Sequence, residues 1–167
     1  SVKVAVIDSG ADVNAPDLAD KSPHTWSVLS RSTGVRDRLG HGTFVASLAT
    51  GSVSNGTGVS GFGGDAQLLV VQAIDADGYI TDVDEAAAIV YAVKHGARIV
   101  NLSIGGTETS AVERRAIRWA TRRGLGMWGG LARPASSADL LPPPSAAAAA
   151  ALELMTLLGQ SALDSCG

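Results

Sequence analysis

The chain has 167 residues, of which 46% are hydrophobic and 17% are charged, enough for the core of one ordinary domain. Its formal net charge of -3 and its mostly scattered basic residues argue against a nucleic-acid surface. No apolar run approaches the roughly 20 residues that a membrane-spanning helix needs, so no membrane partner is expected. The single cysteine, Cys166, excludes an internal disulfide framework and a cysteine-based zinc site. These features leave the oligomeric state open.

Three buried strands are predicted in the first 124 residues. The first covers residues 2–7, a largely β-branched run that stops at Asp8-Ser9-Gly10, and similar runs cover residues 67–73 and 98–104. Helical patterns fill the intervals that follow the strands. This alternation predicts an α/β fold with three layers, in which helices flank a mostly parallel sheet and the crossovers are right-handed.

Three helices are predicted between and after these strands. The first covers about residues 42–50. The second covers residues 82–95 and begins with the capping-box spacing of Asp82 and Glu85, and the third covers residues 110–123 and begins with the same spacing. The predicted apolar face of the second helix consists of Val83, Ala86, Ala87, Val90 and Val93.

Composition changes sharply near Gly124. A run of three prolines at residues 142–144 is followed by Ser145 and six alanines, which is low-complexity sequence without an active-site pattern. We therefore predict that residues 1–124 form the α/β portion and that residues 125–167 form an Ala/Pro-rich tail. The only charged residues in that tail are Arg133, Asp139, Glu153 and Asp164.

Asp8 and His41 are the candidates for acid-base chemistry. Asp8 ends a predicted strand, and functional groups gather at the carboxyl ends of strands in such sheets. His41 lies between two glycines at the predicted start of a helix, where a carboxylate could fix its tautomer and make it a general base. Each residue alone has an ordinary explanation as a turn, cap or loop residue. The pair carries more weight than either member.

Around these two residues the chain resembles the subtilisin-like serine peptidases, or subtilases. Residues 4–10, VAVIDSG, followed by Pro16-Asp17-Leu18, resemble the family's aspartate motif, and residues 37–46, DRLGHGTFVA, resemble its histidine motif. The resemblance covers about residues 2–124 and implies a subtilisin-like fold. The stretches that resemble those leading to the family's substrate cleft are residues 66–74, 77–80 and 96–106.

The resemblance implies an Asp-His-Ser triad in which Asp8 orients His41, and His41 takes a proton from a nucleophilic serine. It also implies a serine endopeptidase that binds an extended peptide or protein substrate between two segments by strand addition. A secreted or extracellular location follows from the resemblance, although no signal peptide is evident in the chain. The residues that match the two substrate segments are Gly78, Tyr79 and Ile80, and Ser103, Ile104 and Gly105.

Two parts of the family's pattern are missing after Gly124. The family continues there with an apolar strand that ends in an oxyanion-stabilising asparagine, and later with a Gly-Thr-Ser-x-Ala-x-Pro nucleophile motif. Residues 125–130 stand in place of that strand, and the last asparagine of the chain is Asn101. Ser145 and Ser161 have only faintly similar surroundings, so the nucleophile stays unknown. We expect a fold that is incomplete at its C-terminal side and a chain that is inactive alone.

Two functional hypotheses therefore remain open. The first is a serine endopeptidase whose chain is incomplete, and the second is a non-catalytic peptide-binding or vestigial domain that has kept the cleft. Nucleotide binding ranks lower because no Gly-x-Gly-x-x-Gly follows the first strand. No cofactor is expected. Residues 52–58 correspond to a loop where some relatives bind calcium, but the loop lacks carboxylates and is interpreted as a turn.

Overall fold

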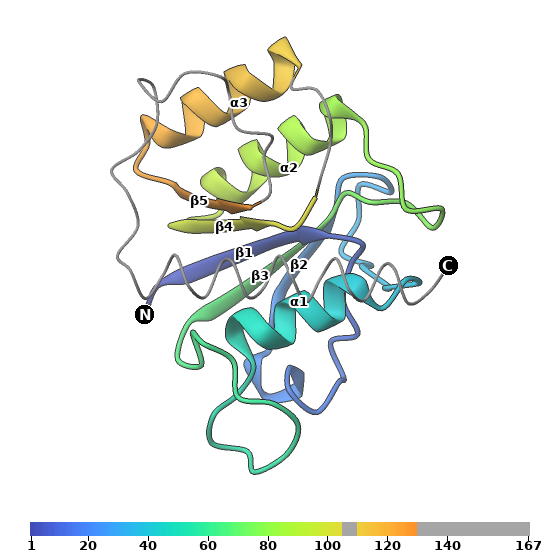
Figure 1. Cartoon of the computed structure of the whole chain (residues 1–167), viewed down its shortest axis with the longest axis vertical. Coiled ribbons are helices and arrows are strands. Elements are labelled where there is room, and N and C mark those ends of the chain that lie inside the picture. Colours follow the sequence, from blue (N-terminus) through green and yellow to red (C-terminus); the bar gives the residue numbers. More distant parts are fainter. Residues whose placement is uncertain (105–109, 130–167) are drawn as a thin grey trace.

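The computed structural model describes residues 1–104 and 110–129. Its centre is a five-stranded sheet in which every neighbouring pair of strands is parallel. The strand order is β2-β3-β1-β4-β5, which places β1 in the middle (Figure 1). None of the helices in the described ranges is long and apolar enough to cross a bilayer. The elements are β1 (Lys3–Asp8), a 3-10 turn (Ala19–Lys21), β2 (His24–Ser27), α1 (His41–Thr50), β3 (Gln67–Gln72), α2 (Asp82–Lys94), β4 (Ile99–Leu102), α3 (Ala111–Thr121) and β5 (Gly126–Gly129).

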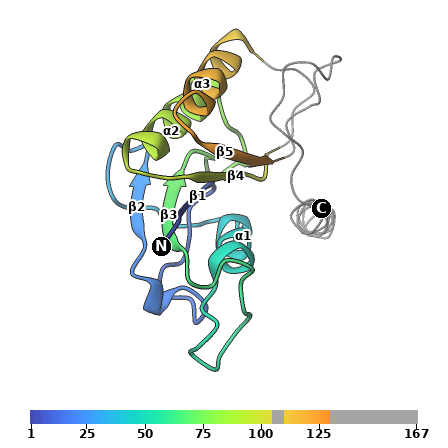
Figure 2. The same cartoon turned by 90° about the vertical axis from the view of Figure 1, so that its left-hand side faces the viewer.

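Helices cover both faces of the sheet. Figures 1 and 2 show α1 on one face and α2 with α3 on the other. Ala5 and Ile7 of β1 pack in the core that contains Ile89 of α2, whereas Val6 packs in the core that contains Val45 of α1. A central parallel strand that is buried on both faces is nearly continuously apolar, as residues 2–7 are. The predicted three-layer α/β fold is confirmed.

One connection differs in hand from the prediction. The units β2-α1-β3, β3-α2-β4 and β4-α3-β5 all step in the same direction along the sheet. Because α1 lies on the opposite face from α2 and α3, its connection must have the opposite hand. The prediction of uniformly right-handed crossovers is therefore wrong. Alternate residues of a strand share a face, so this arrangement puts α1 on the face to which Val6 and Asp8 point.

Helix α2 corrects two further predictions. Its N-cap is Thr81, whose side chain accepts the Asp84 N–H, one residue before the predicted cap. Val83, predicted to be buried, is 65% exposed. Because this helix is apolar on several sides, its periodicity did not fix which side faces the sheet and α3. In α3 the predicted capping box is confirmed. The buried residues of α2 are Glu85, Ala86, Ala88, Ile89 and Ala92.

Strand β5 corrects the prediction for residues 125–130. Residues 126–129 pair in parallel with β4, and Met127 packs against the core that β4 shares with α2 and α3. Backbone hydrogen bonds hold a strand at the sheet edge even where glycines interrupt the apolar pattern. The sheet therefore continues past residue 124. The division of the chain at that residue stays a prediction, because the tail beyond residue 129 lies outside the described residues.

Two glutamate side chains are buried where α2 packs against α3. Glu85 is 8% exposed and Glu113 is 5% exposed. Glu113 takes part in the capping box with Ser110, whereas no residue in the described part of the chain forms a hydrogen bond with the Glu85 carboxyl group. Desolvation raises the pKa of Glu85 to about 7, and the negative charges of Glu113 and Asp82 add to this effect. An ionised Glu85 therefore opposes the packing of the two helices.

The Glu85→Gln variant should gain stability in a pH-dependent way. As the pH rises from 4.5 to about 7, Glu85 ionises in the unfolded chain while it stays protonated in the folded one, so the stability of the unsubstituted chain falls across this window. We expect a gain of about 1–2 kcal/mol at pH 8, reduced for solvent screening, and almost none at pH 4. Urea unfolding at both pH values measures it. Asp20→Asn, at an exposed site, is the control, and equal gains at both pH values would contradict the prediction.

Candidate active site

Asp8 and His41 meet at the carboxyl edge of the sheet. Asp8 is the last residue of β1 and His41 is the first residue of α1. The Nδ1 atom of His41 lies 2.8 Å from Oδ1 of Asp8, so the predicted proximity is present. A neutral imidazole that donates from Nδ1 has a free lone pair on Nε2. Within residues 1–104 and 110–129, nothing forms a hydrogen bond with Nε2 of His41. This atom is available to accept a proton.

The Asp8 side chain is fully buried, and its hydrogen bonds converge on one oxygen. Oδ1 accepts the Ser9 N–H at 2.7 Å and faces His41, whereas Oδ2 has no hydrogen-bond partner in the described part of the chain. An unsatisfied buried acceptor costs about 1–3 kcal/mol. The carboxylate therefore interacts strongly with the few donors that reach it, and His41 is one of them.

The environment of His41 favours its protonated form. The hydrogen bond to Asp8 raises the pKa of His41 and outweighs the lowering caused by burial. The negative charges of Asp8 and Asp37 raise this pKa further. A histidine that gains a proton during a reaction is stabilised by the same two charges.

Asp37 lies beside the pair and gathers five donors. Its Oδ1 accepts the hydroxyl of Ser9 at 2.9 Å, the Gly40 N–H at 2.9 Å and the Leu39 N–H at 3.1 Å. Its Oδ2 accepts the Thr43 N–H at 2.8 Å and the Thr43 hydroxyl at 2.6 Å. Burial acts to raise the pKa of Asp37, but the bonds from Thr43, Ser9 and Gly40 together outweigh it and lower that pKa. The sequence signal for this carboxylate was its place in the histidine motif.

Two glycines allow close backbone contacts at the end of β1: Gly42 lies at the contact with α1, and Gly10 lies at the contact with the loop that precedes α1. A Cβ atom at Gly42 would lie 2.1 Å from the carbonyl oxygen of Gly10, and one at Gly10 would lie 2.3 Å from the carbonyl oxygen of Val35. Gly10 also has a positive φ of 114°, which other residues rarely adopt. The Gly42 N–H donates to Ser9 Oγ at 3.0 Å across this contact. The glycine that follows His41 therefore sets the distance between His41 and Asp8.

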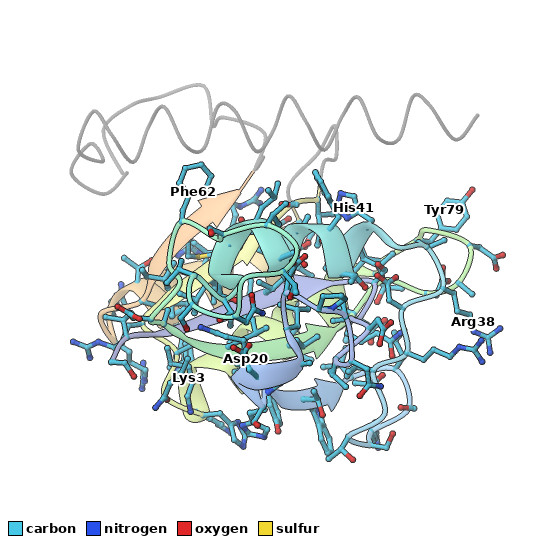
Figure 3. All side chains as sticks on the ribbon, turned by 90° about the horizontal axis from the view of Figure 1, so that it is seen from below. Lys3, Asp20, Arg38, His41, Phe62 and Tyr79 are labelled. Carbon is cyan, nitrogen blue, oxygen red and sulfur yellow. The ribbon has the colours of Figure 1, made fainter. Side chains whose placement is uncertain are left out.

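The first predicted substrate segment lies in a loop close to His41. A Cβ atom at Gly78 would be 4.0 Å from Leu39 Cδ1, so the loop lies beside the segment that leads into α1. The Asp75 carboxylate closes the loop by accepting the N–H groups of Asp77 and Tyr79. Tyr79 is 74% exposed, and Figure 3 shows its side chain along the same side of the molecule as His41. The role of Gly78 and Tyr79 in substrate binding stays a prediction.

The second predicted substrate segment follows β4 at the same edge. Ile7 pairs with Leu102, so Ser103 is level with Asp8 in the sheet. Asn101 Nδ2 donates to the Ser103 hydroxyl at 2.8 Å, and Ile104 packs against the core beneath α2. Gly105 lies outside the described residues, as do the two serines with nucleophile-like surroundings, Ser145 and Ser161.

The loop over residues 52–58 uses its polar groups to hold its own backbone. Asn55 Nδ2 donates to the Pro16 carbonyl at 2.8 Å, and its Oδ1 accepts the Thr57 N–H. Asp17 Oδ1 accepts the Val59 N–H at 2.7 Å beyond the loop. No cluster of three or more His, Cys, Asp or Glu side chains suited to a metal ion occurs in the described ranges. The expectation that no cofactor is bound stays a prediction.

The fold and the Asp8–His41 pair define a class of protein: a parallel α/β domain with a carboxylate-oriented histidine at its sheet edge. The profile of the Subtilase family matches residues 1–132. The chain is 34% identical over 122 residues to thermitase of Thermoactinomyces vulgaris, which is 73% of this chain and 44% of thermitase. It is 35% identical over 124 residues to subtilisin BL of Lederbergia lenta, which is 74% of this chain and 45% of that protein. The chain belongs to the subtilase family.

Solved structures agree with this assignment. Fervidolysin from Fervidobacterium pennivorans, a keratinolytic enzyme related to subtilisin, matches with a TM-score of 0.70 and 28% identity over 77% of this chain and 21% of that chain. A cold adapted subtilisin-like serine proteinase matches with a TM-score of 0.66 at 22% identity over 78% of this chain and 45% of that chain, which supports the fold alone. The subtilisin-like fold is thus confirmed. This chain spans less than half the length of these relatives.

The Gly42→Ala variant should increase the distance between the Asp8 and His41 side chains. Its methyl group would meet the Gly10 carbonyl oxygen at 2.1 Å, so α1 must move away from β1. We expect a loss of about 1–3 kcal/mol in the free energy of unfolding and a fall in the pKa of His41. Urea unfolding and NMR titration of the imidazole measure the two effects.

Gly34→Ala is the matched control for this substitution. Its methyl group would lie 3.7 Å from Ser32 Oγ, which is an ordinary contact, so stability and the His41 titration should stay close to those of the unsubstituted chain. A Gly42→Ala variant with an unchanged His41 titration would show that the glycine does not set the distance to Asp8.

Proposed function

We propose that this chain carries the aspartate and the histidine of a subtilisin-like serine endopeptidase active site. Asp8 orients His41, and His41 acts through Nε2 as the general base for a serine hydroxyl. The observation that carries the proposal is the 2.8 Å contact between a fully buried carboxylate and Nδ1 of a histidine whose other nitrogen is free in the described part of the chain.

The substrate in this proposal is a peptide or protein in extended form. It binds between residues 78–80 and 103–105, where backbone groups of both segments pair with the substrate backbone. The exposure of Tyr79 and the fixed shape of its loop support this assignment. An extracellular site of action is supported by two relatives from Bacillus subtilis, the minor extracellular protease Epr and a cell wall-associated protease, each 32% identical over the matched region.

This chain by itself should have negligible peptidase turnover. General-base assistance contributes about 10²- to 10⁴-fold, but only when a nucleophile is present to be activated. No asparagine follows Asn101, and loss of an oxyanion donor costs about 10²- to 10³-fold on its own. Asp8 and His41 therefore supply only the base function of the reaction.

Non-catalytic peptide binding is the second candidate function. It is favoured by the exposed Tyr79, which projects from a loop that Asp75 holds through two backbone N–H groups. A preformed loop of this kind binds a peptide with little loss of conformational entropy. This function needs no contact between Asp8 and His41.

A serine-directed fluorophosphonate probe tests these proposals on two proteins. The chain of 167 residues should not be labelled. A chimera that joins residues 1–129 to the portion of thermitase after the matched stretch adds the part in which the family resemblance places the nucleophile motif, and it should be labelled and should hydrolyse peptides. His41→Ala in the chimera should abolish both, because nothing else in the described residues fills the base position.

Each outcome separates the hypotheses. Labelling of the chain alone that disappears in its own His41→Ala variant would show that a serine, Ser145 or Ser161 foremost, acts as nucleophile, and would overturn the proposed inactivity. A folded chimera that is labelled equally with and without the His41→Ala substitution would overturn the assignment of His41 as the base. Weak binding of an extended peptide that Tyr79→Ala reduces, together with an inert chimera, would favour the peptide-binding function.

A further inference from the structure

Ser9 has one hydroxyl proton and two carboxylates within reach. Its Oγ lies 2.9 Å from Oδ1 of Asp37 and 3.2 Å from Oδ1 of Asp8. The same oxygen accepts the Gly42 N–H at 3.0 Å, which orients the hydroxyl from the side of α1. A serine hydroxyl donates only one hydrogen bond, so the two carboxylates compete for it. The shorter distance favours Asp37.

The outcome of this competition affects His41. Oδ1 of Asp8 already accepts the Ser9 N–H at 2.7 Å and faces His41 Nδ1 at 2.8 Å. A further donor on this oxygen would share its negative charge and weaken the interaction with His41. A donor that goes to Asp37 instead leaves that charge to the histidine.

Asp37 is well placed to accept the Ser9 hydrogen bond, because backbone groups on both sides of His41 form hydrogen bonds with its carboxylate and hold it in position. Leu39 and Gly40, just before His41, donate their N–H groups to Oδ1, and Thr43, just after it, donates twice to Oδ2. Burial opposes ionisation of Asp37, but the bonds from Thr43, Ser9 and Gly40 lower its pKa, so the group is a charged acceptor at neutral pH. Asp37 is therefore the favoured acceptor, because it is the nearer of the two carboxylates.

We propose that Asp37 is a positioning residue for the Asp8–His41 pair. It accepts the hydrogen bond of the Ser9 hydroxyl, which would otherwise go to Asp8, and it fixes the backbone on both sides of His41. The sequence pattern alone assigns no role to Asp37 or Ser9. The inference rests on the proposed role of the pair in catalysis. Its readout is the protonation of His41 rather than peptide hydrolysis, so the two proposals can fail separately.

The first test compares Asp37→Asn with the unsubstituted chain by NMR titration of His41. The variant loses a charge that favours the imidazolium, and its neutral amide accepts the Ser9 proton less well. We expect proton binding by His41 to weaken about tenfold, a fall of about one pH unit, and the low-field Nδ1–H signal to weaken or disappear. An unchanged titration in a folded Asp37→Asn variant overturns the proposal.

Asp17→Asn is the matched control. Asp17 is also a loop carboxylate that accepts a backbone N–H, that of Val59 at 2.7 Å. Its charge is not among those that act on His41, which are the charges of Asp8 and Asp37. The His41 titration should therefore be the same in Asp17→Asn as in the unsubstituted chain. A fall equal to that in Asp37→Asn would show a general effect of loop charge and overturn the proposal.

A double-mutant cycle with Ser9→Ala separates two effects of Asp37 on His41: the effect of the Ser9 hydrogen bond and the effect of the Asp37 charge. In the Asp37→Asn background, Ser9→Ala removes the hydroxyl that has turned to Asp8, so the pKa of His41 should partly recover. The lost contact with Gly42 is common to both backgrounds and cancels in the cycle. A further fall in the pKa of His41 in the double variant would show that Ser9 has only a structural role, and it would overturn the proposal.

If the Asp37→Asn variant does not fold, the single variant Ser9→Ala tests the proposal. In the proposal the Ser9 hydroxyl already donates to Asp37, so its removal should leave the pKa of His41 close to its original value. A rise would show that the hydroxyl had donated to Asp8 and would overturn the proposal. A fall below the original value also overturns the proposal.

Discussion

The close approach of a strand end to a helix start is the constraint on which this site depends. His41 can reach Asp8 only because α1 begins against the turn that ends β1, and a Cβ atom at Gly42 would lie 2.1 Å from a backbone oxygen of that turn. The sheet is built to allow this approach. β1 is its central strand, and the connection of opposite hand puts α1 on the face to which Asp8 points.

The electrostatics of the site follow from that packing. Burial leaves the Asp8 carboxylate with few donors and one unsatisfied oxygen, which is costly in a low-dielectric interior. Asp37, which is better supplied with donors, takes up the surrounding N–H and hydroxyl groups. Two carboxylates close together thus have different tasks: one interacts with the imidazole, and the other holds the loop that carries it.

The sequence predicted the features that depend on local pattern. The β-branched run before Asp8, the glycines around His41 and the capping box at Ser110 each correspond to a local geometry, and the structure contains all three. Features that depend on tertiary packing were not accessible in the same way. The face of α2 that contacts α3 is chosen among several apolar sides, and the strand at residues 126–129 is held by pairing with β4. Asp37 stands in the recognised motif, but its role needs the position of Ser9, which is distant in sequence.

The energetics of the site bear on the choice between the two proposed functions. Strand addition of a peptide uses backbone groups and side-chain pockets, none of which requires a charged group beneath them. Yet the protein buries the Asp8 carboxylate completely, leaves Oδ2 without a partner in the described part of the chain, and has a glycine at residue 42, where a larger residue would move His41 away from Asp8. These features weaken the fold and add nothing to peptide binding. They are useful only if the imidazole has to be held in one tautomer with its Nε2 free to take a proton. These features support the proposed base function of His41 more than the proposed peptide-binding function.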